Sequence, residues 1–295
     1  MTGCPASFDL IDPVLIQLGP IPIRWYAIAY IAGLFLGLYY VTRLVKRAGL
    51  WSTNDRTQAA PLSRAFLEDL LLWVMVGVIG GGRLGYVLFY ETSAIWERPL
   101  WVFWGVTQGG MSFHGGLIGV ALAIWFTSRA YKMPVLRVAD AVAAATPIGL
   151  FFGRLANFIN GELWGRPAPD LPWAMRFAHD PLCLERHPSQ LYEAFLEGAV
   201  LFAIIAYLIW RVRALSRPGL VAGVFLAGYG VFRGAVELVR EPDNQMPDVL
   251  QGYVTMGMLL CVPMVVIGAW LIRRALQTPA DAIAHKPLPE ARAKS

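Results

Sequence analysis

Seven stretches of apolar residues, separated by polar connections, follow one another along the chain. They lie at about 23–45, 67–90, 112–130, 137–159, 192–212, 219–239 and 249–272, close to the roughly 20 residues that a helix needs to cross a hydrocarbon core. The fourth stretch, with Pro147 and a polar end, is the weakest candidate for a full crossing. The pattern predicts an all-α, polytopic membrane helix bundle of about seven transmembrane helices.

The connections between the stretches predict the organisation of the chain. The connection at about 160–191 holds five prolines, too many for one long helix, and is predicted to form a small extramembrane cap. The segment at 8–23 mixes prolines and acids with apolar residues, which favours a short structure at the membrane interface. We therefore expect residues 1–275 to form a single transmembrane domain and the basic, alanine-rich residues 276–295 to form a flexible tail.

Composition and charge agree with a membrane location. The chain of 295 residues is 57% hydrophobic and only 15% charged, and its mean hydropathy is +0.52. Lysine and arginine gather in the first, third and fifth connections and in the tail, whereas the alternate connections hold fewer basic residues and several acids. Because cytoplasmic loops carry the excess of basic residues, the N-terminus is predicted outside and the C-terminus inside. The net charge of +5 then reflects topology, and a nucleic-acid partner is not expected.

The cysteines indicate neither a metal site nor a cofactor. Cys4, Cys183 and Cys261 have no metal-ligand spacing. Cys4 and Cys183 both fall on the predicted outer side, and the sequence leaves open whether they pair.

Three arginines lie inside predicted membrane stretches. Arg83, Arg154 and Arg233 are each about five to seven residues from the outer end of a stretch, which places them on the order of 10 Å below the outer boundary. An arginine at membrane depth costs roughly 2.5 to 3.5 kcal/mol on insertion scales, so it usually meets a partner in the protein interior. A carboxylate or a bound anion must neutralise them, and a phospholipid phosphate is the anion most available there. Structural ion pairs are the alternative, most of all for Arg83.

Other polar residues share a predicted helix face with Arg154 and with Arg233. Arg154, Asn157 and Gly161 recur at i, i+3 and i+7, and Asn160 follows at the same end. Tyr229, Arg233, Glu237 and Arg240 recur at i, i+4, i+8 and i+11, which allows Glu237 to fix the Arg233 guanidinium. Lipid does not tolerate such a stripe, so it is predicted to face the protein interior.

His114 and several glycines admit two interpretations. His114 lies in GGMSFHGG, residues 109–116, where the flanking glycines clear space around an imidazole that is able to accept a proton near neutral pH. A structural hydrogen bond at a helix start is an equally good reading. Gly77, Gly81 and Gly85 recur every four residues, and close helix packing explains that spacing better than a ligand does.

Four motifs together resemble one family. GRLANFINGELWG at 153–165 is similar to the signature of bacterial prolipoprotein diacylglyceryl transferases. GGMSFHGG at 109–116, HPSQLYEA at 187–194 and GYGVFRGAVELVREPD at 228–243 resemble that family's other motifs in the same order. The resemblance covers about residues 8–272.

The resemblance implies an activity, its partners and its site residues. The expected reaction moves the diacylglyceryl group of phosphatidylglycerol to the lipobox cysteine thiol of a prolipoprotein signal peptide, in the inner membrane and on its periplasmic side, and releases glycerol phosphate. We expect His114, Arg154 and Arg233 to be catalytic. The resemblance implies Tyr26, Asn157, Glu162, Gly165, Tyr229 and Glu237 as substrate-binding residues, and the polar positions in or directly after the apolar stretches add Arg83, Asn160 and Arg240.

An anionic lipid or solute transporter is the main alternative, because it would also place arginines at membrane depth. Such a transporter would carry polar residues in both halves of the membrane or an inverted repeat, and the sequence shows neither. An intramembrane protease would need a nucleophile and base or paired aspartates, and Asp140, near the cytoplasmic end of its stretch, has no second aspartate in that stretch.

Overall fold

The computed structural model describes residues 12–19, 21–52, 62–105, 110–241 and 255–278. The chain divides into two compact units, the first made of residues 1–58 and 140–295 and the second of residues 59–139. Long helices dominate the described residues of both units, which confirms the predicted all-α class. Each unit is described by itself.

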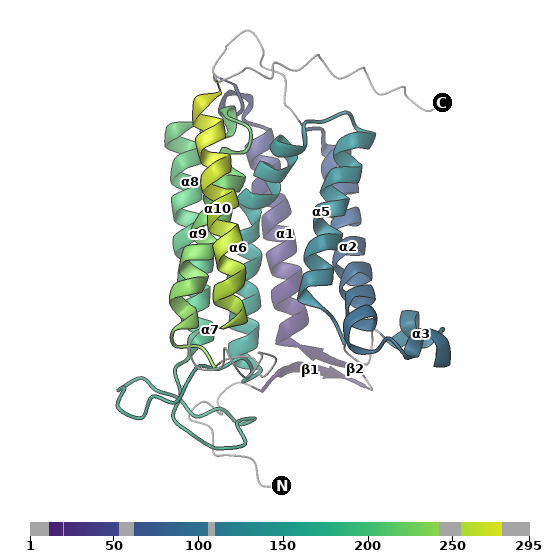
Figure 1. Ribbon diagram of the computed structural model, residues 1–295, viewed down its shortest axis with the longest axis vertical. Helices are drawn as coiled ribbons and strands as arrows, with labels where there is room; N and C mark the ends of the chain where they lie inside the picture. The colour runs from purple at the N-terminus through teal and green to yellow at the C-terminus, as the bar shows by residue number, and fades with distance from the viewer. Residues whose placement is uncertain (1–11, 20, 53–61, 106–109, 242–254, 279–295) are drawn as a thin grey trace. The chain divides into compact units, whose positions relative to one another are not determined.

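The first unit is a helix bundle closed at one end by a hairpin and irregular chain (Figure 1). Its elements are β1 (Val14–Leu18), β2 (Ile21–Arg24), α1 (Trp25–Val45), the 3₁₀ turn η1 (Ala48–Leu50), α6 (Val135–Ile159, which begins in the second unit), α7 (Ser189–Glu193), the π-helix η3 (Ala194–Val200), α8 (Leu201–Val212), the 3₁₀ turn η4 (Ala214–Ser216), α9 (Leu220–Glu237) and α10 (Met256–Gln277). Pro147 lies inside α6, which runs unbroken across the stretch judged weakest.

Glycines bring the helices of the first unit close together. A Cβ atom at Gly223 of α9 would lie 2.9 Å from the Gly268 carbonyl oxygen of α10, and one at Gly33 of α1 would lie 3.1 Å from Cα of Gly149 in α6. Small residues let membrane helices approach and gain van der Waals contact. Asp140 of α6, which is fully buried, accepts hydrogen bonds from the backbone N–H groups of Gly219 (2.7 Å) and Ala222 (2.8 Å), and so satisfies free donors at the start of α9.

The interfacial segment expected before α1 contains a β-hairpin. Strands β1 and β2 pair antiparallel, and Gly19 between them has a φ of +56° that suits a tight turn. Ile16 and Leu18 are exposed on β1. Exposed apolar side chains at the start of a membrane helix agree with the predicted interfacial position.

The second unit is built on two packed helices. It contains α2 (Arg64–Tyr90), the short helices α3 (Ala94–Glu97) and α4 (Trp101–Trp104), and α5 (Phe113–Ala130). Cβ atoms added at Gly77, Gly81 or Gly85 of α2 would overlap the backbone of Gly115 or Gly119 in α5. These glycines are therefore helix-contact residues, as the spacing predicted.

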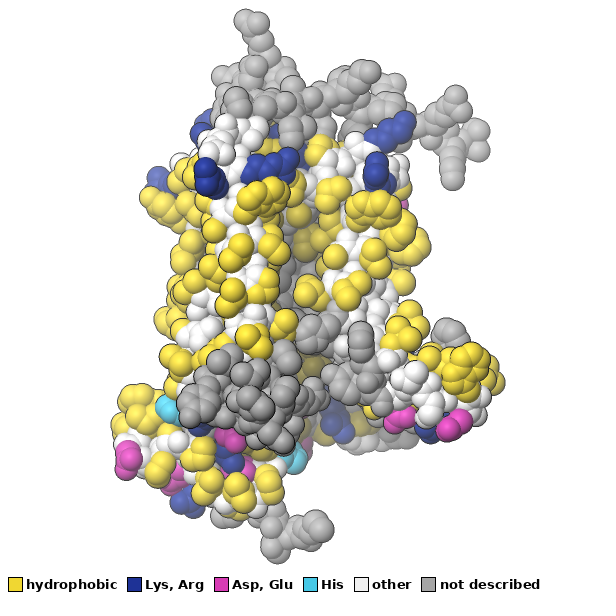
Figure 2. All heavy atoms as spheres, in the orientation of Figure 1, with side chains coloured by type: hydrophobic (Ala, Val, Ile, Leu, Met, Phe, Trp, Pro, Cys, Tyr) yellow, Lys and Arg dark blue, Asp and Glu magenta, His cyan; other side chains and the backbone are white. Residues whose placement is uncertain are grey.

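Six helices in the described part of the chain are long and apolar enough to cross a membrane, and α5 adds a shorter apolar helix. Together they correspond to the seven predicted stretches, and the protein is a multi-pass membrane protein. Figure 2 shows hydrophobic side chains along the helices of the first unit, with Lys and Arg side chains at the end where α10 finishes. Arg273 and Arg274 are exposed there. The inside and outside assignment of the two ends stays a prediction.

The predicted cap is an irregular segment joined by isolated β-bridges. Between the end of α6 and the start of α7, Pro167 and Met175 each bridge to Arg186, and Gly165 bridges to Arg240 beyond α9. It lies at the end of the first unit where α7 begins (Figure 1). Cys4 and the tail after 278 lie outside the described residues, so the pairing of Cys4 and Cys183 is not tested and the flexible tail stays a prediction.

Candidate active site

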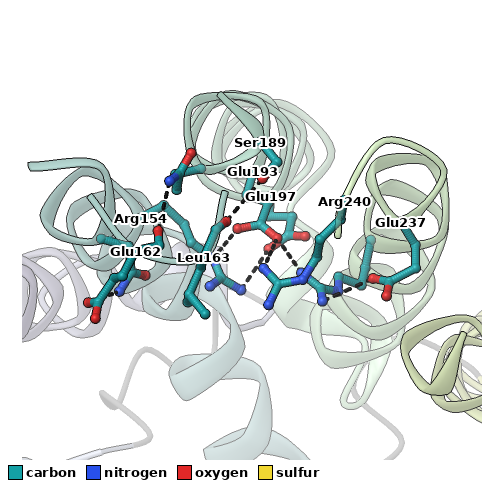
Figure 3. A network of polar contacts seen from close by, with 11 residues as sticks. Arg154, Glu162, Leu163, Ser189, Glu193, Glu197, Glu237 and Arg240 are labelled. Carbon is teal, nitrogen blue, oxygen red and sulfur yellow. Dashed lines mark hydrogen bonds and ion pairs between the residues drawn. The ribbon is translucent and has the colours of Figure 1, made fainter. Parts of the chain in front are cut away.

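Glu193, the last residue of α7, lies at the centre of a buried group of charges (Figure 3). Its Oε2 atom is 3.0 Å from Nε of Arg154, and its Oε1 atom is 3.1 Å from Nη1 of Arg240 and also pairs with Nη1 of Arg233. The Glu193 side chain has no exposed surface. One carboxylate thus joins cations from α6, α9 and the segment after α9.

Two further carboxylates complete the group. Oε2 of Glu237 is 3.0 Å from Nη2 of Arg233, which confirms the predicted pair along α9, and Oε2 of Glu197 is 3.7 Å from Nη2 of Arg154. We call Arg154, Arg233, Arg240, Glu193, Glu197 and Glu237 the arginine–glutamate cluster. Its three cations face three carboxylates, so its formal charge is balanced when all are ionised. Protein carboxylates therefore neutralise Arg154 and Arg233, the structural alternative that the sequence left open.

The end of α6 is built by a helix-capping turn. The Gly161 N–H bonds the Phe158 carbonyl (3.0 Å), the Glu162 N–H bonds the Asn157 carbonyl (3.1 Å), and Gly161 has a φ of +63°. This is the Schellman arrangement, in which glycine takes the left-handed position after the last helical turn. The prediction that Gly161 shares the helix face of Arg154 is therefore wrong, because α6 ends at Ile159 and Gly161 serves the turn.

The capping turn also gathers the predicted polar residues. The Asn157 amide donates to Oε1 of Glu162 (2.8 Å), and the Asn160 amide contacts the same oxygen at 3.4 Å. The Gln190 side chain, buried on α7, donates to the backbone carbonyl of Glu162 (2.7 Å). These bonds tie the end of α6 to the helix that carries Glu193.

The π-helix η3 and two glycines make room for the carboxylates. η3 follows α7 directly and contains Glu197; π-helical turns are rare and occur frequently at functional sites. A Cβ atom at Gly198 would lie 2.7 Å from Cβ of Phe151 in α6, and one at Gly257 in α10 would lie 2.5 Å from Cδ of Glu237. Gly198 thus allows a close approach to the Phe151 backbone, and a side chain at Gly257 would displace the Glu237 carboxylate.

Arg240 and Gly165 meet outside the helices. Helix α9 ends at Glu237, so the expectation that Arg240 continues its helical stripe is wrong. Arg240 instead bridges to Gly165 through its backbone, which still carries its guanidinium to Glu193. A Cβ atom at Gly165 would lie 2.5 Å from the Val239 oxygen and 2.7 Å from Cβ of His187, so a side chain there would separate the segments that hold Arg240.

Two tyrosines border the cluster. The hydroxyl groups of Tyr26 and Tyr30 on α1 are 2.9 Å apart, and Arg154 and Glu162 are among the charged groups that act on Tyr26. Tyr229 of α9 experiences the charges of Glu197, Arg154 and Arg233. The first unit therefore gathers nearly all of the predicted site residues around Arg154 and Arg233.

The remaining two site candidates belong to the second unit. Arg83 donates to the backbone carbonyls of Trp101 (2.9 Å), Val102 (2.9 Å) and Gly110 (3.2 Å), which holds the chain around α4. This favours the structural reading of Arg83, and a substrate contact stays a prediction. His114 lies in the first turn of α5, and its side chain lies outside the described part of the structure.

A second ion pair stabilises the cap. Asp180 accepts from Nε (2.7 Å) and Nη2 (3.0 Å) of Arg186, whose Nη1 reaches Glu241 at 3.1 Å. Burial acts to raise the pKa of Asp180, but the bonds from Arg186 and from the Leu182 and Leu184 amides lower it below its usual value. Burial lowers the pKa of His187. The cap is thus held by a bidentate pair and linked to the exit of α9.

Comparison with known proteins identifies the family. The model of the prolipoprotein diacylglyceryl transferase family matches residues 13–274. The chain belongs to this family. It is 49% identical over 276 residues to the phosphatidylglycerol–prolipoprotein diacylglyceryl transferase of Rhizobium meliloti (strain 1021), covering 93% of this chain and 96% of that protein. The identically named proteins of Azospirillum brasilense (52% over 274 residues, covering 93% and 98%) and Rhodospirillum centenum (49% over 292 residues, covering 97% and 100%) are similar along nearly their whole lengths.

Membership of the prolipoprotein diacylglyceryl transferase family confirms the resemblance, but the residue-level reading missed Glu193 and Glu197. Both lie in the fifth apolar stretch, four residues apart, and Glu193 lies within the HPSQLYEA motif. The reasoning that singled out intramembrane arginines applies equally to carboxylates, which are costly at membrane depth unless paired. The spacing of the two glutamates was the signal that pointed to them.

Proposed function

We propose that the protein transfers the diacylglyceryl group of phosphatidylglycerol to the lipobox cysteine of prolipoproteins. The observation that carries this proposal is the similarity, at about 50% identity along almost the whole chain, to proteins named for that activity. The arginine–glutamate cluster supports it, because it gathers guanidinium groups, which are suited to holding the phosphate of a lipid. The attacking thiol belongs to the prolipoprotein substrate, so the cluster need not supply a nucleophile of its own.

The chemistry assigns tasks to the gathered residues. The thiolate of the prolipoprotein cysteine attacks the carbon of the diacylglycerol unit that is bonded to the phosphate. A carbon–sulfur bond forms, the bond from that carbon to the phosphate oxygen breaks, and glycerol phosphate leaves. Arg154 and Arg233 keep 18% and 14% of their side chains exposed, so they retain surface for a phosphate beyond their glutamate contacts. They stabilise the charge that develops on the leaving phosphate. His114 accepts the thiol proton, and Tyr26, Asn157 and Tyr229 orient the lipid.

In this proposal the reaction takes place in the bacterial inner membrane, with the site toward the periplasm. In the first unit, the cluster lies near the end that carries the cap, and the end where α10 finishes carries exposed arginines. Single cysteines at positions 157 and 233, in a background without the other cysteines, test this with a membrane-impermeant thiol reagent applied to either side. Labelling restricted to the cytoplasmic side would contradict the orientation.

The activity is tested with purified protein in detergent, phosphatidylglycerol and a lipobox peptide, with product mass as the readout. We expect one diacylglyceryl group on the cysteine thiol, and none when phosphatidylglycerol is replaced by diacylglycerol. Arg154→Lys and Arg233→Lys should both lower turnover, because lysine keeps the charge but lacks the bidentate fork. A wild-type protein that modifies no thiol would refute the proposed function.

A further inference from the structure

Glu197 is a buried carboxylate with little support for its charge. Its side chain has no exposed surface, and neither of its oxygens has a hydrogen-bond partner among the described residues. Within the described part of the chain, its one ion pair is with Nη2 of Arg154 at 3.7 Å, too long for a hydrogen bond. Burying an ionised carboxylate without hydrogen bonds costs several kcal/mol unless a cation compensates. The charged form of Glu197 therefore depends chiefly on Arg154, the arginine paired with it.

The charged groups around Glu197 determine how a bound phosphate changes the stability of its ionised form. The charged groups that act on it are Arg154 from α6, Glu193 from α7, and Arg233 and Arg240 from α9 and the segment after it, and Tyr229 of α9 is its polar neighbour. Arg233 and Arg240 already pair with Glu193. The balanced charge of the cluster thus becomes one negative charge in excess when a phosphate enters.

We propose that Glu197 takes up one proton from solvent when an anionic phosphate binds at Arg154, so that it acts as a charge-balancing positioning residue. The phosphate competes for the Arg154 guanidinium, which forms the ion pair with the Glu197 carboxylate. Once Arg154 pairs with the phosphate, the Glu197 carboxylate is buried without a hydrogen-bond donor within the described residue ranges. Its neutral, protonated form is then the more stable one. The inference rests on the proposed function, because the phosphate is that of the phosphatidylglycerol substrate.

Linked protonation has a measurable signature. At a pH where Glu197 is ionised in the free protein, the protein takes up as much as one proton for each lipid that it binds. Its affinity for the lipid then falls up to tenfold for each rise of one pH unit. At lower pH, where Glu197 already carries its proton, uptake stops and the affinity no longer changes with pH. A glutamine at this position, which has the shape of the protonated acid, removes the dependence without removing Arg154.

The experiment measures binding of phosphatidylglycerol to the full-length protein in detergent, without any prolipoprotein, from pH 6 to 9. A pH-indicator dye in weakly buffered solution counts protons, and diacylglycerol serves as the ligand without phosphate. Wild type should take up protons with phosphatidylglycerol alone, and Glu197→Gln should bind it with no uptake and with pH-independent affinity. Glu68→Gln, which alters an exposed glutamate paired with Arg64, should behave as wild type.

Infrared difference spectra provide a readout that does not depend on the folding of the glutamine variant. Lipid binding to wild type should produce the carbonyl band of a protonated carboxyl group, and Glu197→Asp should shift that band. Binding without proton uptake, or uptake that persists in Glu197→Gln, would overturn the inference even if lipid transfer proceeds normally. Failure of wild type to lipidate the peptide would instead overturn the proposed function.

Discussion

Replacing Glu193 with glutamine removes one negative charge from the centre of the cluster and keeps the size of the side chain. The Glu193 carboxylate pairs with Arg154, Arg233 and Arg240 and is fully buried. Removing one partner of a buried ion pair costs about 3–5 kcal/mol, because the remaining charge is left uncompensated. Since three guanidinium groups share this one carboxylate, we expect Glu193→Gln to lower the free energy of unfolding by at least about 3 kcal/mol.

Glu185 in the cap offers a matched control. It pairs with Arg176 at 3.0 Å, the same distance as Glu193 to Arg154. The side chains of Arg176 and Glu185 are, however, 47% and 39% exposed. Exposed pairs contribute about 0–1 kcal/mol, so Glu185→Gln should change stability little. Reversible unfolding in mixed micelles measures both variants, and a loss of equal size in the two would refute the argument from burial.

A double variant separates charge from packing. Glu193→Gln leaves three arginines facing two glutamates, and adding Arg240→Gln restores the balance. We expect the double variant to be less destabilised than the sum of the two single variants, because residues that share one ion-pair network are not additive. In the peptide assay, the turnover of these variants should fall about 10²-fold or more if the loss of about 3 kcal/mol also raises the free energy of the transition state. Additive losses would show that the three arginines do not depend on a common carboxylate.

Three further outcomes are expected. Gly81→Ala should destabilise the packing of α2 on α5 by about 1–3 kcal/mol, since its methyl group would overlap the α5 backbone, whereas Gly80→Ala, which meets nothing within 4 Å, should be neutral in the same thermal unfolding assay. Despite the opposing effect of burial, the bonds from Arg186 lower the pKa of Asp180 below its usual 3.8; the stabilisation of the cap is complete above that pH and is lost as the pH falls through the lowered value. Pepsin digestion from pH 4 to 2 should show this loss in wild type, and a pH dependence that survives in Asp180→Asn would contradict it. His114→Gln should reduce transfer by about 10² to 10⁴-fold, and the deficit should narrow toward pH 9.5 as the substrate thiol ionises unaided; a constant deficit would make His114 an orienting residue.

The free-energy cost of placing a charged side chain in lipid was enough to indicate much of the site. An arginine in an apolar stretch has no favourable place in lipid, so Arg154 and Arg233 had to face a partner whatever the details of the fold. The partner was a different matter. Glu193 and Glu197 stand about 40 residues from both arginines in the sequence, and only the packing of α6, α7 and α9 shows which charges meet.

The local sequence misled wherever a helix stopped earlier than its periodicity suggested. Gly161 and Arg240 continue the helical spacing of Arg154 and Arg233, but α6 ends in a capping turn and α9 ends at Glu237. Helix ends are decided by capping bonds and by the tertiary contacts of the exit segments, which a periodic pattern does not contain.

The sequence by itself determined the membrane helices, because burial in lipid demands about 20 apolar residues at each crossing and that demand is local. It also determined that Gly77, Gly81 and Gly85 form one face of α2 suited to close packing, since the four-residue spacing fixes one helix face, whereas the packing showed that this face meets α5. Only the tertiary structure decided the charge pairing of the cluster and the reason for Gly165, whose added Cβ atom would strike chain segments about 20 and 75 residues away. Helix crossing is set by the composition of one segment, whereas ion pairs and close approaches depend on distances between segments that no single segment encodes.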